Sequence, residues 1–401
     1  MRHRDVTSKL QSLVSFETAS SLAKNLMPTA EGAAVGKTSV RGLARCFPDR
    51  YADGLWVASN ATLSYHMTLE TWQYGMCDRS SLNHRSALKA QSVGVADVLL
   101  PTRSDPYEWK PRDDSCALPR LDTATVCTLL RGRRIMFVGD SVIMSVFYSI
   151  ALALQARTSM DSKGINRRAI VDCGNNATVL FSAVRNDHLQ LPGVPRPAWV
   201  PRYTIAGNWL RHAPDFTVMA SGLHDVTRGG SYLSGTDTFG ERLAAAITRS
   251  GDPARTAAVT IAAPQPGCIN ISKPLHLSRA RRRANSSRWR QDDATLAGAS
   301  FLAQWRVWES RREIARTVAR QTGATFLDLT AITTTRPDRA LGRTKSYLWE
   351  KQRTQQGAAR RPIVIHPADR DCVHYCLPGP TDTAARIVLG WAALRNIQEA
   401  G

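Results

Sequence analysis

The feature that most constrains the fold is a short apolar run at residues 134–138, Arg-Ile-Met-Phe-Val, which ends in Gly139-Asp140-Ser141 and continues into a helix-compatible segment. This pattern predicts a strand, a tight turn and a helix. Similar strand candidates recur at residues 178–181, 216–220, 257–263 and 324–329, and helix candidates at residues 121–130, 142–154, 239–248, 301–321 and 381–399. The alternation predicts an α/β fold with a mostly parallel sheet and helices on both faces.

Length and charge set further limits. The chain has 401 residues, 43% of them apolar, so it can bury a sizeable core and extensive disorder is not expected. The formal net charge of +20 favours polyanionic partners such as nucleic acid, anionic lipid or acidic polysaccharide. Because no zinc-finger, RNA-binding or helix-turn-helix signature is present, we expect no nucleic-acid partner. The Arg-rich run at residues 279–290 either forms a solvated loop or contacts an anionic substrate.

The cysteines and glycosylation motifs indicate an oxidising compartment. The eight cysteines form an even set without the two closely spaced pairs of a zinc site, so disulfides fit better than metal binding. N-glycans and disulfides form in the same secretory lumen. Asn-x-Ser/Thr sequons begin at Asn60, Asn176, Asn270 and Asn285.

The N-terminal region does not contain the expected targeting signal. Residues 1–37 include no apolar run long enough for a signal-peptide core or a membrane span. Three explanations stay open: a missing upstream anchor, which we favour, another route of entry, or reduced cysteines.

Composition divides the chain into three parts. Residues 1–45 are rich in Ser, Thr, Ala and Gly without periodicity and predict a mobile lead-in. Residues 46–131 carry half of the cysteines and little regular pattern, which predicts an irregular, cross-linked collar packed on the core. Residues 132–401 hold the alternating strands and helices and are expected to form the catalytic domain.

Candidate catalytic residues lie far apart in the sequence. Ser141 follows the first predicted strand, where functional groups gather in parallel sheets and where a helix start can stabilise an oxyanion. A serine hydroxyl needs a base, and Asp371-Cys-Val-His374 offers an imidazole with a carboxylate to orient it. Each motif alone is common by chance, and the prediction depends on their combination.

The segments that carry these residues resemble one family. Residues 107–121 read Tyr-Glu-Trp-Lys-Pro-Arg-Asp-Asp-Ser-Cys-Ala-Leu-Pro-Arg-Leu, and residues 371–383 read Asp-Cys-Val-His-Tyr-Cys-Leu-Pro-Gly-Pro-Thr-Asp-Thr. Together with Cys46, Gly54-Leu-Trp-Val57 and the Gly-Asp-Ser turn, these blocks resemble the trichome-birefringence-like family, which belongs to the PC-esterase branch of SGNH proteins. The likeness spans residues 46–397.

The resemblance implies an SGNH-hydrolase-like, flavodoxin-like fold and a polysaccharide O-acetyltransferase of the Golgi lumen. The acetyl group passes from a donor of unknown identity through an acyl-serine to a sugar hydroxyl, and no metal or organic cofactor is required. By carry-over, Ser141 is the nucleophile, His374 the base and Asp371 its orienting partner. Gly139 permits the sharp turn and belongs with Gly222, His224 and Arg185 to the expected oxyanion and substrate residues, whereas Asp140 is structural. The resemblance implies a glycan substrate, either neutral or acidic, and a membrane anchor that is not visible in this chain.

The remaining site residues leave alternatives open. The family type often carries Gly-x-Asn-Asp after a central strand, whereas Ser221-Gly-Leu-His-Asp225 stands here. The oxyanion donor could be the His224 ring or the Gly222 backbone N–H, or His224 could bind the acceptor sugar or make a structural hydrogen bond. Arg185 contacts substrate or lies on the surface. Asp382 is expected to cap the last helix.

The resemblance also implies disulfide pairs. Family members cross-link the collar to the catalytic loop, which implies the pairs Cys46–Cys116, Cys77–Cys376 and Cys268–Cys372 and leaves Cys127 to pair with Cys173. Bonds at Cys372 and Cys376 would hold the segment that carries His374, so a reducing agent should lower activity.

Two other functions remain in view. A carbohydrate acyl esterase uses the same three residues but delivers the acyl group to water. A catalytically silent glycan-binding relative would keep the fold and grip sugars with exposed Trp and Arg side chains. Oligomeric state is not indicated by the sequence.

Overall fold

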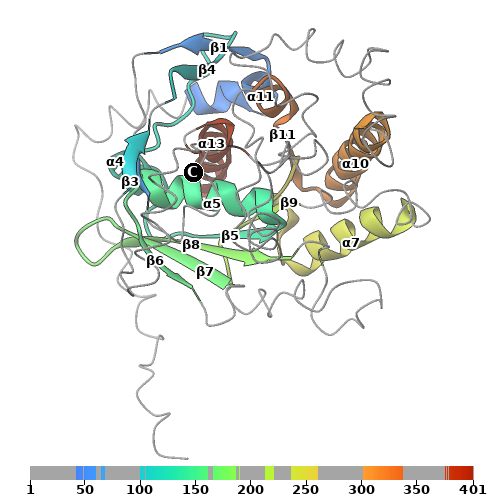
Figure 1. Cartoon of the computed structure of the whole chain (residues 1–401). Coiled ribbons are helices and arrows are strands. Elements are labelled where there is room, and N and C mark those ends of the chain that lie inside the picture. The colour runs from blue at the N-terminus through green and yellow to red at the C-terminus, as the bar shows by residue number, and fades with distance from the viewer. Residues whose placement is uncertain are drawn as a thin grey trace, which may run out of the picture.

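A seven-stranded sheet forms the centre of the computed structural model (Figure 1). The structure describes residues 42–47, 49–59, 65–67, 100–103, 105–160, 166–186, 189, 213–220, 236–260, 301–336, 375, 377 and 379–400. The expected lead-in at residues 1–45 therefore lies almost entirely outside the described residues, as do the Arg-rich run at residues 279–290 and the sequons at Asn60, Asn270 and Asn285. The fourth sequon, at Asn176, lies in an exposed turn between two strands.

The strand order across the sheet is β11-β10-β9-β5-β8-β7-β6. The strands are β5 (Arg134–Gly139), β6 (Arg157–Met160), β7 (Asn166–Asp172), β8 (Thr178–Arg185), β9 (Phe216–Ala220), β10 (Thr256–Thr260) and β11 (Thr325–Asp328). The pairs from β11 to β8 are parallel, and β7 and β6 extend the sheet in antiparallel fashion. In chain order the parallel strands follow the arrangement 2-1-3-4-5, which is that of flavodoxin-like folds. The predicted fold class is confirmed.

Helices cover both faces of this sheet. They are α4 (Thr123–Leu130), α5 (Ser141–Ala153), α7 (Thr236–Arg249), α10 (Phe301–Thr322), α11 (Thr330–Thr334) and α13 (Pro380–Ala400). Helices α5 and α13 pack against each other on one face, and α7 and α10 pack together on the other (Figure 1). Among the described helices, none combines the length and apolarity that crossing a membrane requires.

The two-sided cover follows from the strand sequences. Ile135 and Phe137 of β5 point into the core shared with α5 and α13, whereas Met136 and Val138 point to α7 and α10. Since successive side chains of a strand face opposite sides, an uninterrupted apolar strand needs apolar cover on both faces. All five residues of β9 are buried for the same reason.

The collar contains more regular structure than expected. Strand β1 (Gly54–Ala58) pairs antiparallel with β4 (Tyr107–Pro111), with Trp56 opposite Trp109, and β2 (Tyr65–Met67) pairs with β3 (Leu100–Arg103). A short 3-10 helix, η1 (Arg50–Ala52), precedes β1. Strand β1, Gly-Leu-Trp-Val-Ala, does not alternate apolar and polar residues, and it finds its partner about fifty positions further along the chain. Strand β4 does alternate, as Tyr-Glu-Trp-Lys, so its sequence contained a strand signal that the prediction of an irregular collar did not use.

The described part of the collar shares the core of the sheet. Tyr51 and Trp109 are buried in the same cluster as residues of α5 and α13, and so is Leu43, just before the collar. The Trp109 indole N–H donates to the Tyr51 carbonyl oxygen at 2.9 Å, and the Tyr51 hydroxyl accepts a hydrogen bond from the backbone N–H of Asp328 at 2.8 Å. Burial raises the pKa of Tyr51 well above its usual range, so the hydroxyl stays neutral. The collar is thus anchored to the last strand of the sheet.

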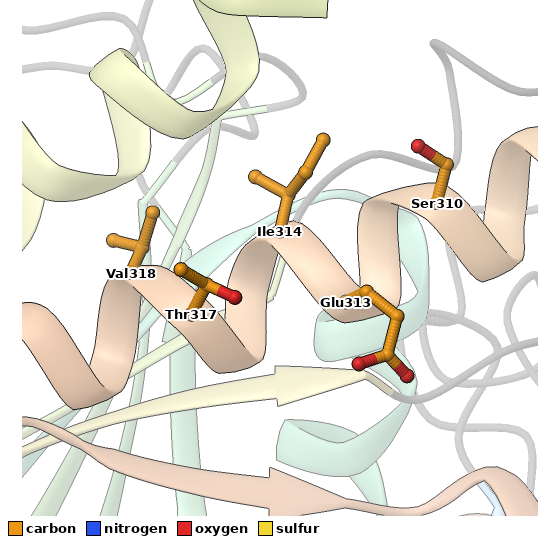
Figure 2. A pocket seen from close by; sticks show the side chains of 5 residues that line it. All are labelled: Ser310, Glu313, Ile314, Thr317 and Val318. Carbon is orange, nitrogen blue, oxygen red and sulfur yellow. The ribbon is translucent and has the colours of Figure 1, made fainter.

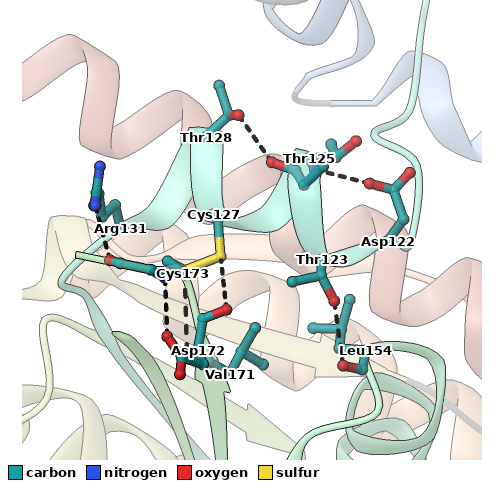
Figure 3. Close-up of a disulfide and its surroundings, with 12 residues drawn as sticks. Asp122, Thr123, Thr125, Cys127, Thr128, Arg131, Leu154, Val171, Asp172 and Cys173 are labelled. Carbon is teal, nitrogen blue, oxygen red and sulfur yellow. Dashed lines mark hydrogen bonds between the residues drawn. A yellow bond between two sulfur atoms is a disulfide. The ribbon is translucent and has the colours of Figure 1, made fainter. Parts of the chain in front are cut away.

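Two disulfides are present among the described residues. Cys46 joins Cys116, with 4.5 Å between their Cα atoms, and Cys127 joins Cys173, at 5.4 Å. Both match the expected pairing. The first joins the start of the collar to the segment that follows β4, and the second ties α4 to the β7–β8 turn, where Arg131 also donates to the carbonyl oxygen of Gly174 (Figure 3). Cys77, Cys268, Cys372 and Cys376 lie outside the described residues.

Candidate active site

Ser141 is the first residue of α5 and directly follows the strand–turn unit at the end of β5. Its neighbour Asp140 is the N-cap. The Asp140 side chain accepts a hydrogen bond from the Val142 N–H at 3.0 Å, and its carbonyl oxygen accepts one from the Met144 N–H at 3.3 Å. Short polar side chains stabilise helix starts in this way. Asp140 therefore has the structural role that we expected, and Ser141 is left as the nucleophile candidate at the helix start.

The turn before Ser141 is locked against both neighbouring strands. Gly139 has φ of +154°, and a Cβ atom at this position would lie 1.6 Å from the carbonyl oxygen of Ala220. The same Ala220 oxygen accepts a hydrogen bond from the Asp140 N–H at 3.1 Å, and the Gly139 carbonyl oxygen accepts one from the Asn186 N–H at 2.6 Å. Only glycine fits between these two strands, because the backbone of β9 occupies the space of a side chain.

The position of this turn in the sheet is the one where ligands bind in open α/β folds. Strand β5 lies between β8 and β9, so the strand order changes direction at β5. Crevices form outside the carboxyl ends of the strands at such a switch point. In the register of the sheet, Gly139 stands opposite both Arg185 and Ala220. The segments that leave β8 and β9 therefore start beside the turn that carries Ser141.

The surroundings of Ser141 suit the stabilisation of negative charge. Its hydroxyl lies at the N-terminus of a 13-residue helix, whose dipole favours an anion at that end. The half-buried Arg185 ends β8 at the same edge of the sheet. Asn186, which is 1% exposed, was not singled out from the sequence. Its backbone bond to Gly139 could not be inferred before the register of β5 and β8 was known.

The acid–base residues Asp371 and His374 lie outside the described residues, but the chain is anchored immediately after them. Tyr375 is fully buried, and its hydroxyl donates to the Thr333 carbonyl oxygen at 2.9 Å. At the start of α13, the hydroxyl groups of Ser149 and Thr381 are 3.1 Å apart, so this end of the segment lies on α5. Ser149 is two turns beyond Ser141, about 12 Å along the helix.

Asp382 serves the cap that we expected. Its carboxylate accepts a hydrogen bond from the Gly379 N–H, while its own N–H donates to the Gly379 carbonyl oxygen at 3.0 Å. This reciprocal pair starts α13 in the manner of a capping box. The oxyanion candidates Gly222 and His224 lie outside the described residues. The pairing of Ser141 with any of these four undescribed residues stays a prediction.

The Asp328 carboxylate also lies at the carboxyl end of a strand of this sheet, but its hydrogen bonds are made to residues away from Ser141. Asp328 ends β11 and accepts hydrogen bonds from Arg312, Arg316 and Thr330. Burial disfavours the charged carboxylate, but the hydrogen bonds and the positive charge of Arg312 outweigh it and hold the pKa of Asp328 below its ordinary value. A carboxylate so fully committed to two arginines is a structural ion pair rather than a partner for an imidazole.

A depression on the surface of α10 is a poor alternative to this site. Its volume is about 300 Å³, and Figure 2 shows its lining by Ser310, Glu313, Ile314, Thr317 and Val318, all on one helix. Val318 belongs to the α7 and α10 side of the sheet, whereas α5 covers the opposite side. The residues that line it include hydroxyl groups and one carboxylate but no imidazole.

Comparison with known proteins shows similarity to acyl esterases and to polysaccharide acetyltransferases. Residues 270–390 match the PC-Esterase family, described as a GDSL/SGNH-like acyl-esterase family found in Pmr5 and Cas1p. Xylan O-acetyltransferase 2 of Oryza sativa subsp. japonica is 26% identical over 323 residues, which are 70% of this chain and 60% of that protein. Protein trichome birefringence-like 1 of Arabidopsis thaliana is 23% identical over 321 residues, covering 69% of this chain and 52% of that protein. The chain thus spans between half and two thirds of the length of these two relatives.

Among solved structures, a catalytic mutant of an acetylxylan esterase from Geobacillus stearothermophilus is similar, with a TM-score of 0.32 and 11% identity. The alignment covers 65% of this chain and 94% of that one. The fold assignment rests on the strand order and not on this likeness.

The strand order, the glycine turn and the serine at the helix start define an α/β protein with a flavodoxin-like sheet that carries a serine at its switch point. Over residues 270–390 the chain is similar to the PC-esterase family, and over about two thirds of its length it is similar to a xylan O-acetyltransferase and a trichome-birefringence-like protein.

Proposed function

We propose that this protein is a polysaccharide O-acetyltransferase in which Ser141 carries the acetyl group. The observation that carries the proposal is the position of Ser141 at the start of α5, beside the switch point of the sheet. The names of its relatives, among them xylan O-acetyltransferase 2, support the reaction class. The substrate is a polysaccharide or glycan, and the acetyl donor is a co-substrate.

The first half of the reaction loads the serine. His374 removes the proton from the Ser141 hydroxyl while the oxygen attacks the acetyl carbonyl carbon of the donor. The oxyanion that forms is stabilised by the start of α5 and by donors from the segment after β9. When the tetrahedral intermediate collapses, the bond between the acetyl carbon and the donor breaks, and the proton on His374 passes to the leaving group.

The second half transfers the acetyl group. The imidazole of His374 takes the proton of a sugar hydroxyl, whose oxygen attacks the acyl-serine. The ester bond to Ser141 breaks, and the serine oxygen regains a proton from the imidazolium. Asp371 orients the imidazole and balances its positive charge. A polysaccharide hydroxyl and water compete for the same acyl-enzyme, so an esterase is the second candidate. No metal or organic cofactor enters either half.

The location of the reaction follows from the same family. We place the enzyme in the Golgi lumen, where its disulfides can form and its glycan substrates are made. Asn176, exposed in the turn between β7 and β8, is the described sequon that an N-glycan could reach. The division into a collar at residues 46–131 and a catalytic domain at residues 132–401 is part of this proposal.

The test is incubation of the full chain with acetyl donors and a panel of glycans, read by mass spectrometry. Wild type should acetylate at least one glycan, and Ser141→Ala should abolish transfer while it keeps the fold. Ser145→Ala is the matched control, because Ser145 is also buried on α5 and its hydroxyl donates to the Ser141 carbonyl oxygen at 3.2 Å. It should retain transfer. The ratio of acetylated glycan to free acetate separates transferase from esterase.

Failure would take distinct forms. Transfer retained by Ser141→Ala would move the nucleophile to another residue. A wild-type protein that neither transfers acetyl groups nor reacts with a fluorophosphonate probe at Ser141 would indicate a silent glycan-binding protein.

A further inference from the structure

The last turn of α11 is held in place by side chains of the collar. The Trp56 indole N–H donates to the Thr335 hydroxyl at 3.1 Å and approaches the Ile332 carbonyl oxygen at 3.3 Å. Directly after the helix, the Arg336 guanidinium forms two hydrogen bonds of 2.9 Å with the carboxylate of Asp105. Trp56 lies in β1 and Asp105 lies between β3 and β4, so both belong to the collar and are more than two hundred positions away from α11 in the sequence.

This clamp is dry. Arg336 is 0% exposed and Asp105 is 6% exposed. The guanidinium also lies over the Trp56 ring, 4.3 Å from its centroid, and 5.3 Å from the centroid of Tyr107. A bidentate pair of this kind specifies one geometry more strongly than an exposed pair, because the two planar groups fit in a single orientation. The end of α11 is therefore a rigid platform.

Tyr375 is attached to that platform. Its hydroxyl donates to the Thr333 carbonyl oxygen at 2.9 Å, and the same oxygen accepts the Arg336 N–H at 3.2 Å. Carbonyl groups at a helix end have no partner within the helix, so Thr333 offers an acceptor that the α-helical pattern leaves open. The ring of Tyr375 is 0% exposed. Both ends of the side chain are thus fixed, the ring by packing and the hydroxyl by a hydrogen bond.

Tyr375 is also the residue that directly follows His374. Consecutive Cα atoms are about 3.8 Å apart across a trans peptide bond, so an anchored Tyr375 confines the backbone of its neighbour. The other anchors of this segment, at Gly379 and Thr381, lie further along the chain. Among the described residues, Tyr375 is therefore the contact closest in sequence to the proposed base.

We propose that Tyr375 is a positioning residue for His374, and that the collar acts on catalysis through it by clamping α11. The proposal rests on the proposed function, since it assigns a role in that reaction. It states that the Tyr375 hydroxyl transmits the position of the α11 platform to the acid–base segment. The sequence gives Tyr375 no catalytic signature.

The test compares Tyr375→Phe with Tyr51→Phe in the full chain. Tyr51 is a matched control because it is also 0% exposed and its hydroxyl also bonds to a backbone group, the Asp328 N–H. Both substitutions keep the ring and remove one hydrogen bond. We expect Tyr375→Phe to lower kcat by about three- to tenfold, the range that corresponds to one hydrogen bond, with KM unchanged. Tyr51→Phe should lower thermal stability and keep kcat.

Two further measurements separate positioning from mere stability. The rate at which a fluorophosphonate probe labels Ser141, corrected for the folded fraction, should fall with kcat in Tyr375→Phe, since labelling also needs the base. The acid limb of the pH profile of kcat should move to lower pH, because a less firmly held carboxylate partner raises the imidazole pKa less.

The outcomes are distinguishable. A Tyr375→Phe protein with wild-type kcat, labelling rate and pH profile overturns this inference while the proposed function stands. Equal losses of kcat in Tyr51→Phe and Tyr375→Phe overturn it as well, because they show a general effect of stability. A wild-type protein without transfer activity, or a Ser141→Ala protein that retains it, overturns the proposed function and, with it, the role of Tyr375.

Discussion

The backbone N–H of Asp140 donates to the carbonyl oxygen of Ala220 at 3.1 Å, and this contact joins the serine-bearing turn to the next strand of the sheet. The two backbones can approach so closely because the intervening residue, Gly139, has no side chain. The orientation of Ser141 therefore depends on a residue that has no side chain.

Replacement of Gly139 by Ala should damage both fold and activity. The added Cβ would lie 1.6 Å from the Ala220 oxygen, which is a backbone atom and cannot move aside without disturbing β9. We expect a loss of more than about 2 kcal/mol in the free energy of unfolding, because strand backbones must separate. Urea denaturation measures the first effect and the transfer assay the second.

Gly132→Ala is the control for this experiment. Gly132 also has a positive φ, +75°, but no atom lies within 4 Å of the position of its Cβ. Its replacement should cost about 1 kcal/mol, the penalty of the left-handed backbone alone. Equal losses in the two variants would show that the contact with Ala220 is not what matters.

Removal of one member of the buried pair of Asp105 and Arg336 should lower the free energy of unfolding strongly, whereas replacement of both by apolar residues should lower it little. Asp105→Leu leaves the Arg336 guanidinium, 0% exposed, without its carboxylate, and we expect a loss of about 3–5 kcal/mol. The double variant with Arg336→Met removes both charges and should recover most of this loss. Free energies of unfolding for the two single variants and the double variant give the coupling. If the losses of the two single variants simply add in the double variant, the two side chains do not stabilise each other, which would contradict the role of this ion pair.

Stability should depend on pH below about 4 through Asp328. The pKa of its carboxyl is lower in the folded protein than the ordinary value near 3.8, so its ionised form stabilises the fold above that value. This contribution is lost as the pH falls through the folded-state pKa. Asp328→Asn should therefore be destabilising at pH 7, and its difference from wild type should shrink as acid protonates the wild-type carboxylate. Thermal melting between pH 7 and pH 2 measures this difference.

Asp113 provides the comparison for Asp328. Hydrogen bonds from Ser115 and Arg50 lower the pKa of its carboxyl to about 2, but its ion pair with Arg50 lies on the surface. Exposed pairs are screened by water and contribute little. Asp113→Asn should therefore shift the melting temperature less than Asp328→Asn at pH 7, and a larger shift would count against the assigned role of Asp328.

Local sequence patterns predicted the elements of the catalytic part well. The apolar run before Gly139 is β5, and the helix predicted from residue 142 is α5, which begins one residue earlier. Strands and helices of this kind reveal themselves because burial on both faces leaves uninterrupted apolar runs and helix caps are short-range features. The strands β6 and β7 gave no such signal, since they lie at the antiparallel edge, where exposed Arg157 and Arg168 interrupt the pattern.

The residue types of the chain thus determined that a parallel sheet would form and that a serine would follow its first strand. Folding in three dimensions decided which strands flank that serine, that Gly139 lies against Ala220, and that Trp56 and Asp105 hold the end of α11 near Tyr375. Periodicity and capping act between residues a few positions apart and can be recognised along the chain. Strand order and buried ion pairs join residues as much as 231 positions apart, and packing alone selects them.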